Sequence, residues 1–191
     1  MDVDINAIIS RVKRIFTFDL TVFQEVEADQ TATRQAWVVV AVAAVASAIG
    51  SAIGSLISGG GFVGLLIALI LTPIFAIAGY FVWAFVTSWV GVNMFQGQTD
   101  FEEMQRVIGF AYAPNALGFF SFIPCVGWLA SLAGGLYALA LSVLAVKEGL
   151  DVDWVPAIIT CVIGWIANFV LLFIPSLIVG LVIGGATAAL S

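Results

Sequence analysis

The chain has 191 residues, of which 62% are hydrophobic and only 9% are charged. Globular domains carry about 25% charged residues, so this composition excludes an ordinary soluble protein. The net charge is −6 and no basic patch with interleaved aromatic residues is present, so nucleic acid is not an expected partner.

The sequence has no histidine, which removes the commonest metal ligand and the usual general base near neutral pH. The two cysteines, Cys125 and Cys161, are too few for a zinc site, and we expect two separate free thiols. We therefore predict no metal, no cofactor and no catalytic residue, and a chain that is not an enzyme.

Three long stretches carry no charged residue at all, namely 35–99, 107–146 and 154–191. Each exceeds the roughly 20 apolar residues that a membrane-spanning helix needs. We predict an all-α, polytopic integral membrane protein. Because intramembrane hydrolases and proton relays use Asp, Glu or His within their spans, these stretches also argue against such functions.

Residues 5–16 place apolar side chains at helical spacing, with Arg11 and its basic neighbours on the opposite side. The pattern predicts an amphipathic interfacial helix, with three possible roles: a lipid anchor, a partner-docking helix, or a helix packed on the cytoplasmic end of the bundle. A polar, acidic linker follows it. We assign residues 1–35 to a cytoplasmic N-terminal segment and residues 36–191 to a transmembrane domain.

The first predicted span runs from about Ala36 to Ser58 and has small residues at every fourth position. Two stripes result: Ala46, Gly50, Gly54 and Ser58, and beside them Ser47, Ser51 and Ser55. Small residues let helix backbones approach closely within a membrane. This face is therefore predicted to contact another helix of the bundle or a second chain.

A glycine turn at 59–61 leads to a second predicted span at 62–96. At about 1.5 Å per residue this segment is longer than the apolar core of a membrane is thick. It must therefore tilt, kink at Pro73 or extend into the interface. Asn93, near its end, is either a pore-lining side chain or an ordinary interfacial residue.

Asp100 has the sequence context of a helix N-cap, with Glu103 at the capping-box position three residues later. These two residues predict the start of a third membrane helix. Arg106 is placed to pair with Glu102 or Glu103 one turn earlier.

Pro114 interrupts this third helix, because its ring clashes with the carbonyl of Phe110 and it has no N–H to donate. We predict a kink near Phe110, with Tyr112 or Asn115 supplying a donor to the freed carbonyl. The kink is either a hinge or small substrate site, or a structural feature satisfied by neighbouring helices. Gly109 offers a second close-packing position.

The fourth predicted span, residues 126–146, has Gly134 within another small-residue face. The fifth runs over 154–190 and contains Pro175. Asn168 is its one strongly polar residue at mid-membrane depth, and it predicts either interhelical hydrogen bonding or a ligand-binding amide.

Five spans place all six basic residues on one side of the membrane if residues 1–35 are cytoplasmic. This distribution satisfies the positive-inside rule. We predict a protein of the cell (cytoplasmic) membrane that contacts membrane lipids, with its N-terminus in the cytoplasm and its C-terminus outside.

Three sequence motifs accompany this organisation. The third predicted helix begins with FEEMQRVIGFAYAP at 101–114, the fourth and fifth are joined by AVKEGLDVDW at 145–154, and FTFDLTVFQEV at 16–26 precedes the first span. With these motifs the chain resembles the Yip1 domain family, in its bacterial and archaeal branch.

The resemblance implies a five-helix membrane protein with a cytoplasmic N-terminus and no catalytic residue. Eukaryotic relatives act in vesicle trafficking, bind small GTPases and associate with one another. The acidic cytoplasmic motif that those members use near the first span is not clearly present here, so GTPase binding is not carried over.

The leading functional hypothesis is a non-enzymatic membrane scaffold or adaptor, an accessory subunit of a larger complex that binds a partner or itself through its small-residue faces. The alternative is a small-solute transporter or channel that uses the kinked third helix with Asn93, Asn115 or Asn168. The candidate packing and interaction residues are Gly50, Gly54, Ser58, Gly109, Pro114, Asn115, Gly134 and Asn168.

Overall fold

The computed structural model describes residues 4–189, and the side chains of residues 4–170 and of Phe173. Over this range the chain is helical throughout and has no strand, which confirms the predicted all-α class. The helices are α1 (Ile5–Phe16), α2 (Val22–Ala28), α3 (Ala32–Ile57), α4 (Gly61–Phe95), α5 (Phe101–Ala111), the 3₁₀ helix η1 (Ala113–Phe122), α6 (Val126–Leu150) and α7 (Trp154–Ala189).

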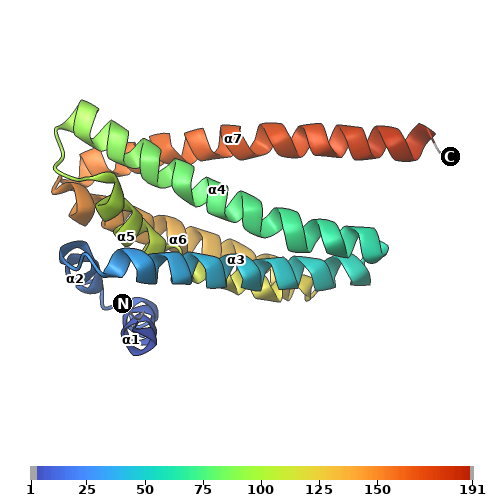
Figure 1. Cartoon of the computed structure of the whole chain (residues 1–191), viewed down its shortest axis with the longest axis horizontal. Coiled ribbons are helices and arrows are strands. Elements are labelled where there is room, and N and C mark those ends of the chain that lie inside the picture. The colour runs from blue at the N-terminus through green and yellow to red at the C-terminus, as the bar shows by residue number, and fades with distance from the viewer. Residues whose placement is uncertain (1–3, 190–191) are drawn as a thin grey trace.

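The long helices α3, α4, α6 and α7 run lengthwise (Figure 1). Helices α3 and α7 run away from the end that holds α1, α4 and α6 run back toward it, and α5 with η1 leads outward between α4 and α6. The short helices α1 and α2 lie at one end, where the α4–α5 and α6–α7 connections also lie. Every charged residue that the structure describes lies in or next to α1 and α2, in the connections at this end, or in the turns of α3, α5 and α6 nearest to it. We call this the charged end of the bundle.

Three helices are long and apolar enough to cross a membrane, namely α3, α4 and α6. They correspond to the first, second and fourth predicted spans. The 35-residue α4 continues through Pro73 and is about 52 Å long, so it exceeds the membrane core without breaking. Helix α7 likewise continues to Ala189, while the predicted end of the fifth span at residue 190 lies outside the described residues.

The third predicted span is two elements instead of one kinked helix. Helix α5 ends at Ala111, and η1 continues the chain as a 3₁₀ helix. The prediction of a kink near Phe110 is therefore wrong. Pro114 lies in the first turn of η1, where the backbone N–H that it lacks would have no helical partner.

The backbone around this junction is satisfied locally. Asn115 donates from Nδ2 to the carbonyl of Tyr112 at 3.1 Å, and Ser47 Oγ donates to the carbonyl of Asn115 at 2.9 Å. Asn115 thus supplies a donor as expected, but to a different carbonyl from the one predicted.

Two glycines allow η1 to lie against both of its neighbours. A Cβ on Gly50 of α3 would lie 2.3 Å from the carbonyl oxygen of Phe119, and one on Gly134 of α6 would lie 2.7 Å from that of Pro114. Real Cβ atoms do not approach oxygen so closely, and any side chain at these positions would push η1 away. The small-residue faces on α3 and α6 therefore pack within the chain.

Candidate functional site

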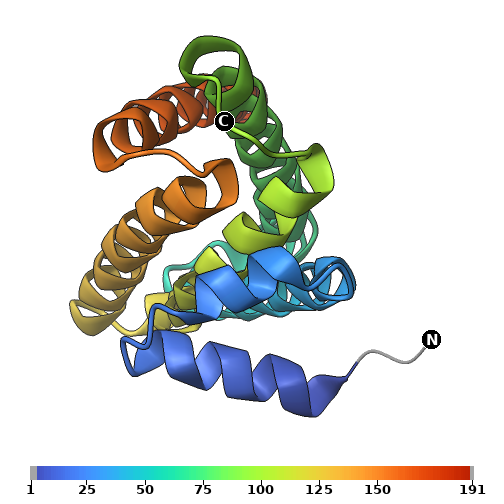
Figure 2. The same cartoon turned by 90° about the vertical axis from the view of Figure 1, so that its left-hand side faces the viewer.

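Helix α1 lies across the bundle near its charged end, as the end-on view makes clear (Figure 2). Asp4 caps the helix by accepting hydrogen bonds from the N–H groups of Asn6 and Ala7. Ile8 and Ile15 are buried, whereas Ile5 and other apolar side chains stay exposed. Residues 5–16 form a helix, one side of which packs on the bundle's own end, and its interfacial position stays a prediction.

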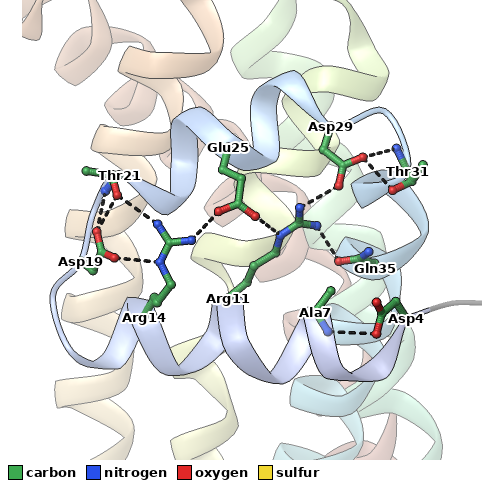
Figure 3. A network of polar contacts seen from close by, with 10 residues as sticks. All are labelled: Asp4, Ala7, Arg11, Arg14, Asp19, Thr21, Glu25, Asp29, Thr31 and Gln35. Carbon is green, nitrogen blue, oxygen red and sulfur yellow. Dashed lines mark hydrogen bonds and ion pairs between the residues drawn. The ribbon is translucent and has the colours of Figure 1, made fainter.

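Arg11 lies on the packed side of α1 with Ile8 and Ile15, whereas Ser10 and Lys13 are exposed. Arg11 is only 7% exposed, because α2 covers this side of the helix. Its guanidinium contacts Glu25 at 2.9 Å, Asp29 at 2.7 Å and the side-chain oxygen of Gln35 at 2.7 Å (Figure 3). One arginine therefore joins α1, α2 and the start of α3.

Arg14, one turn later, extends the network toward the α1–α2 turn. It bonds Asp19 at 2.7 Å, donates to Thr21 and also pairs with Glu25 (Figure 3). The side chains of this outer part are a third to a half exposed, in contrast to that of Arg11. We call α1, α2 and their connections, residues 4–31, the cap.

The charges of the cap hold one another in their ionised forms. Hydrogen bonds from Arg14 and Arg11 lower the pKa of Glu25. Burial alone would raise the pKa of Asp29, but hydrogen bonds from Thr31 and Arg11 outweigh it and lower this pKa. Buried ion pairs persist where further hydrogen bonds satisfy the charges, and these pairs meet that condition.

Arg106 also points into the cap, which the sequence did not reveal. It is 6% exposed and donates to the carbonyl of Glu27 at 3.0 Å and to Thr33 Oγ1 at 3.4 Å. The predicted pairing with Glu102 or Glu103 is wrong, because this face of α5 turns inward, against the α2–α3 connection. The N-cap prediction is confirmed, since Asp100 accepts from the N–H of Glu103 at 2.7 Å.

Glu27 is the one carboxylate of the cap whose pKa is raised to about 7. Burial is the main cause, followed by the nearby carboxylates of Asp151, Glu103 and Glu148, and Glu27 also shares a hydrogen bond with Glu103. Like charges disfavour the ionised form, so Glu27 changes its protonation state near neutral pH.

Between α1 and α3 the cap leaves an apolar groove of about 500 Å³. Ile9 and Phe16 of α1, and Val38 and Val42 of α3, form its sides, and Lys13 also lines it. Val42 is 60% exposed although it lies within the groove. Exposed apolar surface of this kind marks a contact with another protein or with lipid.

A second hollow lies inside the bundle, between α4, η1, α6 and α7, with a volume of about 200 Å³. We call it the central cavity, because it lies near the middle of α4 and α6. The polar and aromatic side chains that line it include Tyr80, Trp83, Tyr112, Asn115, Trp165 and Asn168.

The structure brings two of the predicted site residues together in the central cavity, Asn115 and Asn168. Asn93 is elsewhere: it is exposed near the end of α4 and donates to the carbonyl of Trp89. Two of the three asparagines of the transport alternative therefore line the same cavity. Asn168 Oδ1 is buried and has no hydrogen-bond partner among the described side chains, so the interhelical bond favoured from sequence is not observed for this atom.

The remaining predicted site residues serve packing within the chain. Gly54 approaches the backbone of Phe122, and Gly109 approaches Ala36 and the hydroxyl of Tyr80. Ser58 is exposed and bonds back to the carbonyl of Gly54. Their role in binding a partner stays a prediction.

The chemistry available at these places is binding and packing. Within residues 4–170 no cluster of three or more potential metal ligands occurs. Cys125 and Cys161 are free thiols, the first exposed and the second buried.

Comparison with known families returns one finding. The model of the Yip1 domain matches residues 13–175, most of the chain, from α1 into α7. No curated protein and no solved structure matches.

Proposed function

Because the chain belongs to the Yip1 domain family, a non-enzymatic family of membrane proteins, we propose that it is a membrane scaffold or adaptor, an accessory subunit of a larger membrane complex. In this proposal residues 1–35 form its cytoplasmic segment and residues 36–191 its five-span domain. The protein lies in the cell membrane, with its N-terminus in the cytoplasm and its C-terminus outside.

The path of the chain supports five crossings. The helices α3 and α4, then α5 with η1, then α6 and α7 run alternately away from and toward the charged end (Figure 1). All described basic residues lie at that end, which satisfies the positive-inside rule when it faces the cytoplasm. The placement of α1 across the bundle fits an interfacial helix.

The apolar groove beside α1 is the observation that carries the adaptor proposal. Its α1 side is held in place by the buried contacts of Arg11, so the groove is already formed before any partner arrives. A preformed apolar groove next to a membrane helix suits the apolar face of another helix. Its side chains are apolar except for that of Lys13, and no acid–base pair lines it.

Site-specific photo-crosslinking in native membranes tests this proposal. A photoreactive residue replaces Val42 in the groove, and the matched control replaces Ile158, an exposed residue of α7 on the other side of the bundle. We expect a protein adduct of defined mass at residue 42 and lipid adducts alone at residue 158. Chains carrying two different tags then show whether the partner is a second copy.

Two results together would refute the adaptor function. One is lipid adducts alone at residue 42. The other is a strictly monomeric particle, with no second chain, after purification in mild detergent.

A further inference from the structure

The central cavity contains one unpaired hydrogen-bond donor and one unpaired acceptor. The indole N–H of Trp83 and Oδ1 of Asn168 are both buried, and neither has a hydrogen-bond partner among the side chains that the structure describes. The thiol of Cys161 lies within reach of the indole, but sulfur is a weak acceptor and satisfies this N–H poorly. Buried polar atoms are nearly always satisfied, so a missing partner is expected in this place.

We propose that the central cavity binds one small, uncharged molecule that carries both a hydrogen-bond donor and an acceptor, of the polyol or carboxamide class. A hydroxyl or amide group accepts from the Trp83 N–H and donates to Asn168 Oδ1. An anion would leave the acceptor unmet, and a cation would leave the donor unmet. This binding goes beyond the adaptor function and does not depend on it.

The walls of the cavity also select an uncharged ligand. No Asp, Glu, Lys or Arg lines it, so an ion would enter the cavity without a counter-charge. Burying an unpaired ion is far more costly than burying a neutral polar group that forms hydrogen bonds. The aromatic faces of Tyr80 and Trp165 instead suit the carbon side of a small polar molecule.

The size of the cavity limits the ligand further. A volume of about 200 Å³ corresponds to roughly six or seven water molecules at liquid density, which suits glycerol or acetamide but not a nucleotide. Tyr80 is held in place, because its hydroxyl donates to the carbonyl of Gln105 at 2.8 Å. That wall is therefore fixed before a ligand binds.

Saturation-transfer NMR on the purified full chain, prepared without glycerol, tests the proposal with glycerol and acetamide as neutral probes. Acetate and guanidinium serve as charged probes of similar size. The variants are Asn168→Leu and Trp83→Phe, with Asn93→Leu as the control for an exposed asparagine outside the cavity. We expect binding of at least one neutral probe by the wild type and by the control.

Each cavity variant should weaken that binding about three- to tenfold, the effect of one hydrogen bond to a neutral group. Thermal unfolding identifies any variant that fails to fold, and Trp83→Phe keeps an aromatic ring in the same wall. The proposal is overturned if neither neutral probe binds, as when water or a lipid chain fills the cavity. It is also overturned if both cavity variants bind like the wild type, or if a charged probe binds as well as the neutral ones.

Discussion

Replacing Arg11 with alanine should loosen α1, because its buried guanidinium joins this helix both to α2 and to the start of α3. The side chain is 8% exposed and bonds Glu25, Asp29 and Gln35, with the ring of Phe110 5.9 Å away. Removing it leaves two carboxylates and an amide oxygen without their partner. Arg14→Ala is the matched control, since Arg14 lies one turn later on the same helix and also pairs with Glu25.

The expected magnitude follows from the burial of each arginine. Removing one partner of a buried ion pair costs about 3–5 kcal/mol. Glu25 and Asp29 are 45% and 28% exposed, so water recovers part of that loss, and we expect about 2–3 kcal/mol for Arg11→Ala. Arg14 is 31% exposed and its partners are more so, which gives about 0–1 kcal/mol.

Hydrogen exchange of the α1 amides, in detergent or nanodiscs, measures this difference as a local opening free energy. Arg11→Ala should speed exchange in α1 about 30- to 160-fold, and Arg14→Ala less than about fivefold, while α3 stays protected in both. Arg11→Lys should give an intermediate result, because lysine keeps the charge but not the forked geometry. Equal effects of the two alanine variants would refute the conclusion that Arg11 is the buried centre of the cap.

Three further outcomes are expected. Gly134→Ala should lower the unfolding free energy, measured by denaturant titration, by about 1–3 kcal/mol, because the added methyl group would meet a carbonyl of η1. In the control Gly135→Ala the methyl group meets nothing within 4 Å, so this variant should be neutral or stabilising. The pKa of Glu27 is raised to about 7, so the stability that its protonated form contributes is complete below about pH 4.5 and is lost as pH rises through 7. Glu27→Gln should therefore increase the unfolding free energy at pH 8 by about 1 kcal/mol after solvent screening, and leave it unchanged at pH 4. Thermal unfolding at the two pH values measures the difference. A membrane-impermeant maleimide added to intact cells should label Cys125, which is exposed at the far end of the bundle, and should leave the buried Cys161 unlabelled. If Cys125 is labelled only after the cells are opened, the proposed orientation is contradicted.

The helices themselves could be predicted because charge and hydropathy change sharply along the chain. The uncharged stretch from residue 35 to 99 contains α3 and α4, and Asp100 caps α5 as its context indicated. These features depend on neighbours within a few positions, which a sequence displays directly.

The cap could not be predicted, because its contacts join residues far apart in sequence. Helical periodicity placed Arg11 on the side of the helix opposite its apolar residues, but the partners that bury it, Asp29 and Gln35, lie 18 and 24 positions later. The meeting of Asn115 and Asn168 in the central cavity could not be predicted for the same reason, because these residues are also far apart in sequence. A sequence shows that such residues are unusual in a membrane protein, but it does not show which of them meet.

The change to a 3₁₀ helix at Pro114 lengthens this segment, which the proposed topology counts as the third crossing. The 11 residues of α5 rise about 16 Å, and the 10 residues of η1 rise about 20 Å at 2.0 Å each, where an α-helix would rise only 15 Å. The sum exceeds the ~30 Å core of a membrane. A 3₁₀ helix is also narrower, and Gly50 and Gly134 let its backbone lie directly against α3 and α6. Since η1 occupies the close-packing positions at Gly50 and Gly134, the proposed protein partner would contact another surface, and we propose the apolar groove beside α1.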